Sequence, residues 1–427
     1  MGHVAAKDVY RELGAKLDSL SCRAPYNATL RAILKELYTE EEADLVVRMP
    51  AGLSNLKKLE QATGIGRERL KALLESATSK GLVLDLWVKD EFRYTPSPFV
   101  IGIFEFTLMR TRGQLNTKEW ARLFHEYMDE GPFWSANLGN GEKVAILRTV
   151  ARDEALPVEG HLEIFDYERA SNFIEQSERY AVGICACRHE KLHLGIKACK
   201  VPLETCTSFG RAADYLIRHG LAREIGKAEM RELFAASRES GLVLCADNVQ
   251  NRVSYVCHCC KCCCSALAGI TRHGYPNAVV TSGFLAKADG EKCNGCGVCV
   301  KACPVNAIKL EEKKARVDAG ACLGCGVCVV KCSRKALRLD RRQRRVIPPE
   351  DLFEKIILQG LEKGTLGGQL FDDPRSGAQR FLRAFVGGFL RLDPVRRALT
   401  SDALRSGFLR AVKAGVRMKR MEELLDL

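Results

Sequence analysis

The chain has 427 residues, of which 46% are hydrophobic and 28% charged, values typical of a protein with ordinary buried cores. Twenty residues are cysteine, and the formal net charge is +13. No apolar run is long enough to span a membrane, and the N-terminal sequence lacks the apolar region of a signal peptide. We therefore expect a cytoplasmic protein, working without oxygen, whose clustered thiols bind metal or take part in redox chemistry.

The N-terminal part predicts a winged-helix-like domain over residues 1–98, because helices separated by glycine are followed by a two-stranded hairpin. The expected elements are helices over 27–48 (with a second start at Thr39), 56–63 and 67–80, and strands over 82–88 and 92–95. Residues 1–110 contain 16 Lys or Arg against 15 Asp or Glu. This balance argues against binding to nucleic acid, which depends on an excess of positive charge.

The rest of the chain predicts a multidomain α+β protein. The expected domains are a helical connecting region at 99–160, a cysteine-rich α/β domain at 161–282, a domain with an internal repeat at 283–342 and a basic helical region at 343–427. In the α/β domain we expect strands at 162–165, 180–187 and 242–244, and helices at 208–219 and 227–240. In the last region, glycine pairs at 367–368 and 387–388 are expected to loosen the helices.

Residues 293–303 (CNGCGVCVKAC) and 322–332 (CLGCGVCVVKC) repeat the spacing C-x2-C-x2-C-x3-C. This spacing is typical of a pair of [4Fe–4S] clusters, in which the fourth cysteine of each repeat binds the other cluster. It predicts one cluster on Cys293, Cys296, Cys299 and Cys332, and a second on Cys322, Cys325, Cys328 and Cys303. Two zinc sites fit less well, because zinc takes four ligands per site and does not require the same four-cysteine spacing to occur twice.

The repeat resembles the bacterial 2[4Fe–4S] ferredoxins over residues 287–340. Pro304 follows Cys303, as that family expects, whereas Ser333 stands in place of the second proline. This departure affects the stiffness of the loop more than ligation. The resemblance implies a ferredoxin domain at 283–342 that transfers electrons.

Ten further cysteines are candidate ligands of one or two additional clusters, which makes three or four in all: Cys185, Cys187, Cys199, Cys206, Cys257, Cys259, Cys260, Cys262, Cys263 and Cys264. We expect Cys185 and Cys187 to share one face of a strand end, and Cys199 and Cys206 to lie on a loop before a helix. These four are candidates for one cluster. The run CHCCKCCC (257–264) has too many thiols for a single centre, so it either serves two centres or contains a reactive thiol site.

Several residues near these cysteines have predicted supporting roles. His258 is expected to form hydrogen bonds rather than to bind metal, and Arg188 and His189 to shield or hydrogen-bond cluster sulfurs. The run RLDRRQRR (338–345) is either a solvated face or a surface that steers an acidic partner. No G-x-G-x-x-G sequence follows a strand, so no nicotinamide or flavin site is expected.

The order of the segments ICACRHEK, CKVPLETC and CHCCKCCC before the repeat is similar to that in a group of 4Fe–4S dicluster-domain proteins of anaerobic bacteria. In that group a winged helix precedes a CxCR segment and a run similar to CNCCxCCC, and the likeness covers residues 27–340. It implies an electron carrier, or a subunit of an anaerobic redox enzyme that exchanges electrons with a partner protein. Two alternatives stay open: a redox-sensing winged-helix transcription regulator, and an iron–sulfur reductase whose substrate site lies within 185–264.

Overall fold

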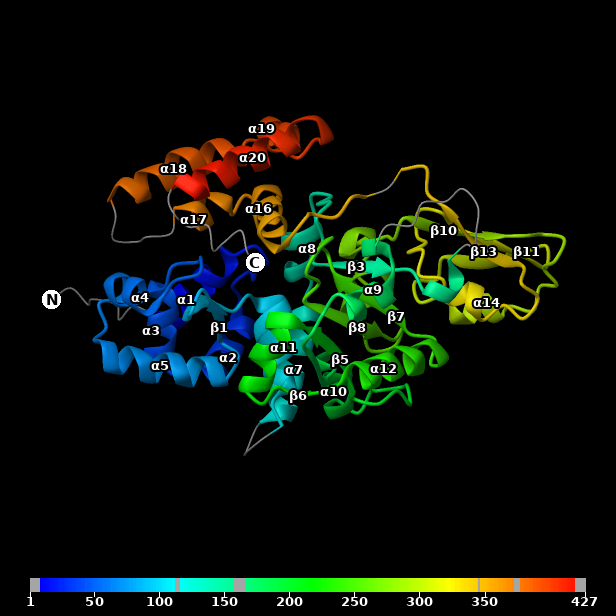
Figure 1. Ribbon diagram of the computed structural model, residues 1–427, viewed down its shortest axis with the longest axis horizontal. Coiled ribbons are helices and arrows are strands. Elements are labelled where there is room, and N and C mark those ends of the chain that lie inside the picture. The colour runs from blue at the N-terminus through cyan, green and yellow to red at the C-terminus, as the bar shows by residue number, and fades with distance from the viewer. Residues whose placement is uncertain (1–7, 112–115, 157–165, 345, 372–376, 419–427) are drawn as a thin grey trace. The chain divides into compact units, whose positions relative to one another are not determined.

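The computed structural model describes residues 8–111, 116–156, 166–344, 346–371 and 377–418, and Figure 1 shows its helices and strands. The chain forms two compact units. Unit 1 contains Met1–Glu142 and Leu352–Leu427, and unit 2 contains Lys143–Asp351. Both helices and sheets are present, so the fold is of the mixed α/β kind.

The N-terminal part of unit 1 contains the helices and the hairpin that the sequence predicts. Thr39 begins a helix with a capping box, in which its side chain accepts from the backbone of Glu42 while the Glu42 side chain accepts from the backbone of Thr39. Gly64 ends another helix in the left-handed conformation. The winged-helix assignment itself stays a prediction. The elements are α1 (Val9–Asp18), α2 (Ala28–Leu37), α3 (Glu40–Arg48), α4 (Leu56–Thr63), α5 (Arg67–Ser79), β1 (Val83–Val88), β2 (Glu91–Pro96), α6 (Phe104–Met109), α7 (Thr117–Asp129) and α8 (Pro132–Leu138).

The C-terminal helices also belong to unit 1. They are α16 (Leu352–Glu362), α17 (Leu366–Leu370), α18 (Gly377–Arg391), α19 (Asp393–Leu399) and α20 (Asp402–Met418). The expectation that the glycine pairs loosen these helices stays a prediction, and the structure gives Gly367 and Gly387 a packing role. A Cβ added to Gly367 would lie 2.6 Å from the Cα of Gly387, so the missing side chains let α17 and α18 pack closely.

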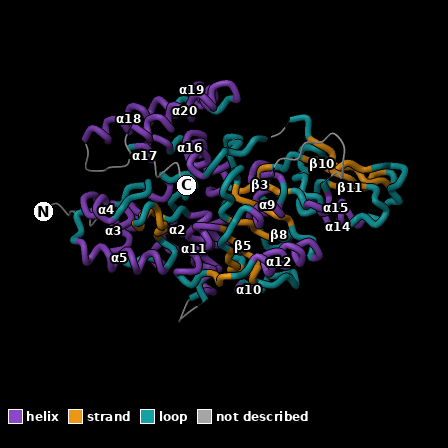
Figure 2. Tube along the Cα trace, in the orientation of Figure 1, coloured by secondary structure: helices purple, strands orange, loops and turns teal. Residues whose placement is uncertain are grey.

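A seven-stranded sheet forms the centre of unit 2, with the strand order β6-β4-β5-β8-β7-β3-β9 in the described part of the chain. Neighbouring strands are antiparallel except β3 and β9, which are parallel. Figure 2 shows β5, β8 and β3 as orange strands between purple helices. The strands are β3 (Leu147–Val150), β4 (Tyr180–Ile184), β5 (Glu204–Phe209), β6 (Ala222–Glu224), β7 (Val243–Asp247), β8 (Tyr255–Cys259) and β9 (Val279–Val280).

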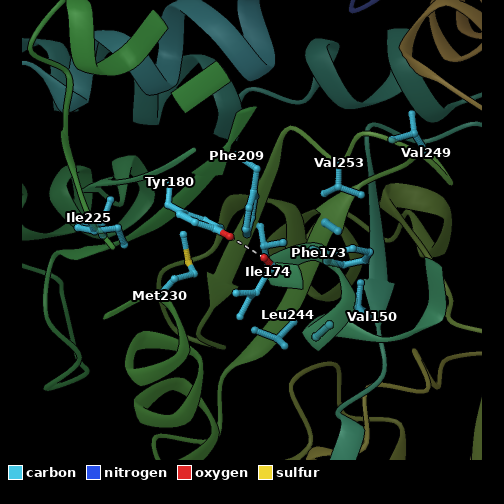
Figure 3. Close-up of a cluster of buried hydrophobic side chains, with 14 residues drawn as sticks. Val150, Phe173, Ile174, Tyr180, Phe209, Ile225, Met230, Leu244, Val249 and Val253 are labelled. Atoms are coloured by element: carbon cyan, nitrogen blue, oxygen red, sulfur yellow. Dashed lines mark hydrogen bonds between the residues drawn. The ribbon is translucent and has the colours of Figure 1, made fainter. Parts of the chain in front are cut away.

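One face of this sheet carries an apolar core, shown in Figure 3. Side chains alternate between the two faces of a strand, so Leu244 and Val256 enter this core while their neighbours Cys245 and Cys257 point to the opposite face. Helices α9 (Ala170–Glu175) and α12 (Lys227–Glu239) supply Phe173 and Met230 to the core. The remaining helices of the domain are α10 (Ala186–His193), α11 (Gly210–Arg218) and α13 (Ser265–Thr271).

Three expectations about the α/β domain need correction. Cys185 and Cys187 do not share a strand face, because β4 ends at Ile184 and Cys185 is the residue before α10. Cys206 is not on a loop but within β5, where it pairs with Cys257 of β8. The connecting region expected to be helical contributes β3 to the sheet. The strand predicted at 162–165 lies outside the described residues.

The last part of unit 2 contains the repeat, and we call residues 283–342 the repeat module. Strand β10 (Phe284–Ala288) pairs antiparallel with β13 (Leu337–Arg341), and β11 (Ile308–Glu311) pairs with β12 (Lys314–Val317). The short helices α14 (Val298–Ala302) and α15 (Val327–Val330) contact each other. Each begins after a glycine in the left-handed conformation, Gly297 and Gly326, so the sequence repeat is also a repeat of backbone structure.

Within the part of the chain that the structure covers, no helix combines the length and the apolar character needed to cross a membrane.

Candidate metal centres

The eight cysteines of the repeat module line two separate cavities. The inner cavity is lined by Cys303, Cys322, Cys325 and Cys328, and the outer cavity by Cys293, Cys296, Cys299 and Cys332. Each set takes three sulfurs from one repeat and one from the other. Counting the part open to solvent, the space not filled by protein atoms is ≈ 320 Å³ for the inner cavity and ≈ 380 Å³ for the outer cavity.

The two cavities differ in exposure. All four cysteines of the inner cavity are buried, and the apolar side chains of Val305, Ile308 and Leu323 complete its lining. In the outer cavity Cys296 is exposed, and Cys293 and Cys332 are half-buried. The inner cavity is therefore the better shielded from water.

Backbone N–H groups already point at the sulfurs. Ala307 N donates to Cys303 Sγ at 3.2 Å, and Ala336 N donates to Cys332 Sγ at 3.4 Å, the equivalent bond in the second repeat. Gly324 N donates to Cys322 Sγ at 3.4 Å. Such bonds favour the thiolate form and are one of the ways in which a protein sets the reduction potential of an iron–sulfur cluster.

Gly324 has to be glycine for this geometry. Its φ is +71°, and an added Cβ would lie 2.2 Å from the carbonyl oxygen of Phe284. The loop between Cys322 and Cys325 therefore passes close to β10, and only a residue without a side chain fits there.

Two arginines support the inner cavity. Arg152 N donates to the carbonyl oxygen of Cys325 at 3.3 Å, while the buried Nε of Arg152 has no hydrogen-bond partner among the described atoms. Arg342 donates to the carbonyl oxygens of Phe284 (2.9 Å) and Cys322. Both arginines therefore hold the backbone that carries the cysteines of this cavity, Arg152 through its main chain and Arg342 through its side chain.

Burial and hydrogen bonding act in opposite directions on the thiols. Burial raises the pKa of Cys325 to about 12 and also raises the pKa of Cys328. In the outer cavity, the backbone N–H groups of Gly295 and Ala315 lower the pKa of Cys293. The buried thiols therefore keep their protons unless a metal ion replaces them, which links metal binding to proton release.

Four sulfurs upstream of the repeat form a compact group that we call the tetrad: Cys199, Cys260, Cys262 and Cys263. All four Sγ atoms lie within 4.8 Å of one another. In the part of the chain that the structure describes, no other set of three or more His, Cys, Asp or Glu side chains is this compact.

The other upstream cysteines form a second group that we call the thiol network: Cys185, Cys187, Cys206, Cys245, Cys257, Cys259 and Cys264. Strand register brings Cys206, Cys257 and Cys245 side by side on β5, β8 and β7. Hydrogen-bonding contacts then run from Cys257 to Cys259, Cys264 and Cys187, and end at Cys185. The run 257–264 thus divides between the tetrad and the thiol network. Cys199 belongs to the tetrad, whereas Cys185, Cys187 and Cys206, with which the sequence grouped it, belong to the thiol network.

Arg188 lies between the tetrad and the thiol network. Its side chain is 1% exposed and donates hydrogen bonds to the Sγ of Cys260, to the hydroxyl of Thr205 and to the carbonyl oxygen of His258. Its buried Nε has no partner in the described structure. The expectation that Arg188 shields or hydrogen-bonds cluster sulfurs stays a prediction.

The two histidines near the cysteines bond to other groups. His258 points to the face of the sheet that carries the apolar core, where its Nδ1 lies 2.5 Å from Ser237 Oγ and its Nε2 lies 3.1 Å from Thr207 Oγ1. The predicted hydrogen-bonding role of His258 is confirmed. His189 Nε2 lies 2.8 Å from His193 Nε2.

Sequence reasoning missed four residues at or near these sites. Cys245 was left out of the candidate ligands, although the alternation of LVLC (242–245) places it on the face opposite the apolar core. Arg152 carried no local signal, because its contact with Cys325 spans most of unit 2. The run 338–345 is not wholly a free charged surface, since Arg341 pairs with Glu168 at 2.6 Å and Arg342 holds the loop of Cys322.

Comparison with known proteins identifies one part of the chain. Residues 285–333 match the family described as the 4Fe-4S dicluster domain. No curated protein and no solved structure matches the chain. The match and the cysteine-lined geometry support [4Fe–4S] binding in the repeat module, and with it an iron–sulfur protein of the electron-transfer class.

Proposed function

We propose that the chain is an electron-transfer protein that binds one [4Fe–4S] cluster in each cavity of the repeat module. The single observation that carries the proposal is that the segment matching the dicluster family folds around two cavities, each lined by four cysteines. When bound, such clusters supply one-electron oxidation and reduction. The ligands are Cys293, Cys296, Cys299 and Cys332 for the outer cavity, and Cys303, Cys322, Cys325 and Cys328 for the inner cavity.

The crossed ligand sets suit transfer between the two sites. Cys299 lies within α14 and Cys303 directly after it, yet they line different cavities. Cys328 within α15 and Cys332 just beyond it are divided in the same way. Since α14 and α15 contact each other, the two sites share a short stretch of packed protein. An electron that enters at one cavity therefore has a direct route to the other.

A partner protein is proposed to exchange electrons at the outer cavity. Cys296 is exposed there, and two lining residues next to it are exposed apolar side chains, Val298 at 45% and Leu310 at 41%. Arg334 lines the same cavity, and Lys309 next to Leu310 is exposed. A small apolar patch with positive charges at its edge is suited to a transient contact with an acidic redox protein.

The thiol network is proposed to bind a further cluster, as the sequence predicts for part of this region. Its seven thiols are more than one cubane needs, and the orphaned Nε of Arg188 is a buried donor available to a cluster sulfide. With the two clusters of the repeat module, this makes three. The tetrad is treated separately below.

Iron and acid-labile sulfide analysis of the full chain, purified without oxygen, tests the proposal. We expect about twelve irons if the thiol network is filled and about eight if only the repeat module is, at four per cluster. Cys325→Ser and Cys296→Ser should each reduce iron and sulfide together and change the EPR spectrum of the reduced protein. Cys22→Ser, a buried thiol in unit 1, is the matched control and should leave both counts unchanged. Colourless protein without sulfide would contradict the proposal.

The transcription-regulator alternative is less well supported. On α5, the helix expected to contact DNA, Arg67 pairs with Glu60, Arg69 with Glu41 and Lys71 with Glu68. Its positive charges are therefore balanced by the protein itself, and little is left to neutralise phosphate. Retention of the chain on DNA that does not fall with added salt would count against this alternative.

The reductase alternative depends on a reactive thiol within 185–264. Cys259 contacts Cys245, Cys257 and Cys264, so it is the most connected thiol of the network. If Cys259→Ser loses iron and sulfide, Cys259 is a ligand. If it keeps both but loses a reductase activity, the alternative gains support.

A further inference from the structure

The tetrad joins two segments that lie far apart in the sequence. Cys199 is on the loop between α10 and β5, and Cys260, Cys262 and Cys263 are in the turn between β8 and α13. The apolar residues Leu242 and Val201 pack against it. Cys260 and Cys263 are buried, while Cys199 and Cys262 are half-buried.

The spacing of the tetrad sulfurs matches a tetrahedron around a single ion. Cys199 Sγ lies 3.8 Å from Cys260 Sγ and 3.9 Å from Cys263 Sγ. Cys262 Sγ lies 3.7 Å from Cys260 Sγ and 3.5 Å from Cys263 Sγ. Four thiolates at about 2.3 Å from one zinc ion form a tetrahedron with edges of about 3.8 Å.

The same spacing is too tight for a cubane. A [4Fe–4S] core lies between its four thiolates, one on each iron, and so holds them farther apart than thiolates that share one ion. In the repeat module, by contrast, four cysteines line each of two cavities rather than meeting at one point. The chain thus contains two kinds of cysteine site, and the tetrad differs in kind from the sites of the repeat module.

Two cationic side chains, Arg188 and Lys197, contact residues of the tetrad. Arg188 donates to Cys260 Sγ, and the ammonium of Lys197 donates to the carbonyl oxygen of Cys199. Four thiolates with one divalent ion carry a net charge of about −2. A buried guanidinium beside them offsets part of this charge and orients the ligand, as hydrogen-bonding neighbours of metal ligands commonly do.

We propose that Cys199, Cys260, Cys262 and Cys263 bind one thiophilic divalent ion, Zn²⁺ or Fe²⁺, in a tetrahedral all-thiolate site that is separate from the [4Fe–4S] clusters. Tetrahedral coordination by four sulfurs is typical of these two ions. The ion fastens the loop of Cys199 to the turn after β8. Lys261, within that turn, donates to Asn306 Oδ1 at 2.7 Å, so the site also supports the loop that follows Cys303.

Metal analysis of the full chain, purified without oxygen, tests this proposal. We expect Cys199→Ser and Cys262→Ser each to lose about one equivalent of zinc or iron while acid-labile sulfide is unchanged. Cys22→Ser, a buried thiol in unit 1 that belongs to none of the proposed sites, is the control and should keep that ion. A variant that loses iron and sulfide in equal amounts would show a cubane and overturn the proposal.

X-ray absorption on the unmodified protein keeps the test decisive if the variants fail to fold. At the zinc edge we expect four sulfurs at about 2.3 Å and no neighbouring iron. If zinc is absent, one high-spin iron with four sulfur ligands in the Mössbauer spectrum supports the same site for Fe²⁺. Neither signal, or two disulfides among the four cysteines, would overturn it. These readouts are independent of the iron–sulfide count that tests the repeat module.

Discussion

The guanidinium of Arg188 donates a hydrogen bond to Cys260 Sγ, and this arginine is 1% exposed. It also donates to the carbonyl oxygen of His258, two residues before Cys260. A fully buried cation is costly unless negative charge lies nearby. The position of Arg188 is therefore explained by thiolates, in the tetrad on one side and in the thiol network on the other.

Replacing Arg188 should weaken metal binding at the tetrad. Removing a hydrogen-bonding neighbour of a metal ligand typically lowers affinity by about 10–100-fold, so in Arg188→Gln we expect the ion to be transferred to a chelator correspondingly more easily. Arg188→Lys keeps the charge and should give an intermediate value. The measurement is chelator competition followed by metal analysis, and equal affinities in all three proteins would contradict the role of the cation.

The two cavities should lose their clusters in a fixed order. Because Cys296 is exposed and all four cysteines of the inner cavity are buried, we expect brief air or chelator treatment to empty the outer cavity first. Alkylation followed by mass spectrometry should label Cys293 and Cys296 before Cys325 and Cys328. Simultaneous labelling of both sets would contradict the difference in shielding.

Gly324→Ala should impair the inner cavity. The left-handed backbone and the contact with the carbonyl oxygen of Phe284 make a side chain at this position cost about 1–3 kcal/mol in local strain. We expect iron and sulfide to fall by up to one cluster. Gly290→Ala, in the same module, is the control, because nothing lies within 4 Å of its added Cβ. Normal iron content in Gly324→Ala would show that the loop can shift.

Glu42 should make the stability of unit 1 depend on pH. Burial alone would raise the pKa of Glu42, but hydrogen bonds from Lys80 and Ser76 and from the Thr39 backbone lower it below its ordinary value of 4.5. A carboxyl whose pKa is lower in the folded state stabilises the fold above about pH 4.5, and this stabilisation is lost as the pH falls through the folded pKa.

Glu42→Gln should therefore destabilise unit 1 by about 1–2 kcal/mol at pH 7, and by less below pH 4. The three tryptophans, Trp87, Trp120 and Trp134, all lie in unit 1, so their fluorescence during denaturation reports on this unit alone. Glu41→Gln removes an exposed partner of Arg69 and is the control, with an expected change under 1 kcal/mol. A difference between wild type and Glu42→Gln that is independent of pH would contradict the argument.

Local pattern was enough to predict several elements of the fold. The capping box at Thr39, the hairpin β1–β2 and the helix α12 depend on residues within a few positions of each other, and each lies where the sequence predicts it. The end of β4 was placed too late, because the apolar alternation of YAVGICAC continues past Ile184 while the backbone has already turned into α10. Alternation alone does not reveal where a strand loses its partner.

The grouping of the cysteines also depends on local sequence in one part of the chain and on distant contacts in another. For Cys293 to Cys303 and Cys322 to Cys332, gaps of two or three residues and glycines such as Gly297 and Gly326 leave few conformations, so the two groups of four could be read from the sequence. Upstream, Cys206, Cys245 and Cys257 meet only because β5, β7 and β8 pair in one register, and Cys199 reaches Cys260 across 61 residues of chain. Contacts between distant segments depend on the packing of the whole sheet, which is why only the tertiary structure separated the tetrad from the thiol network.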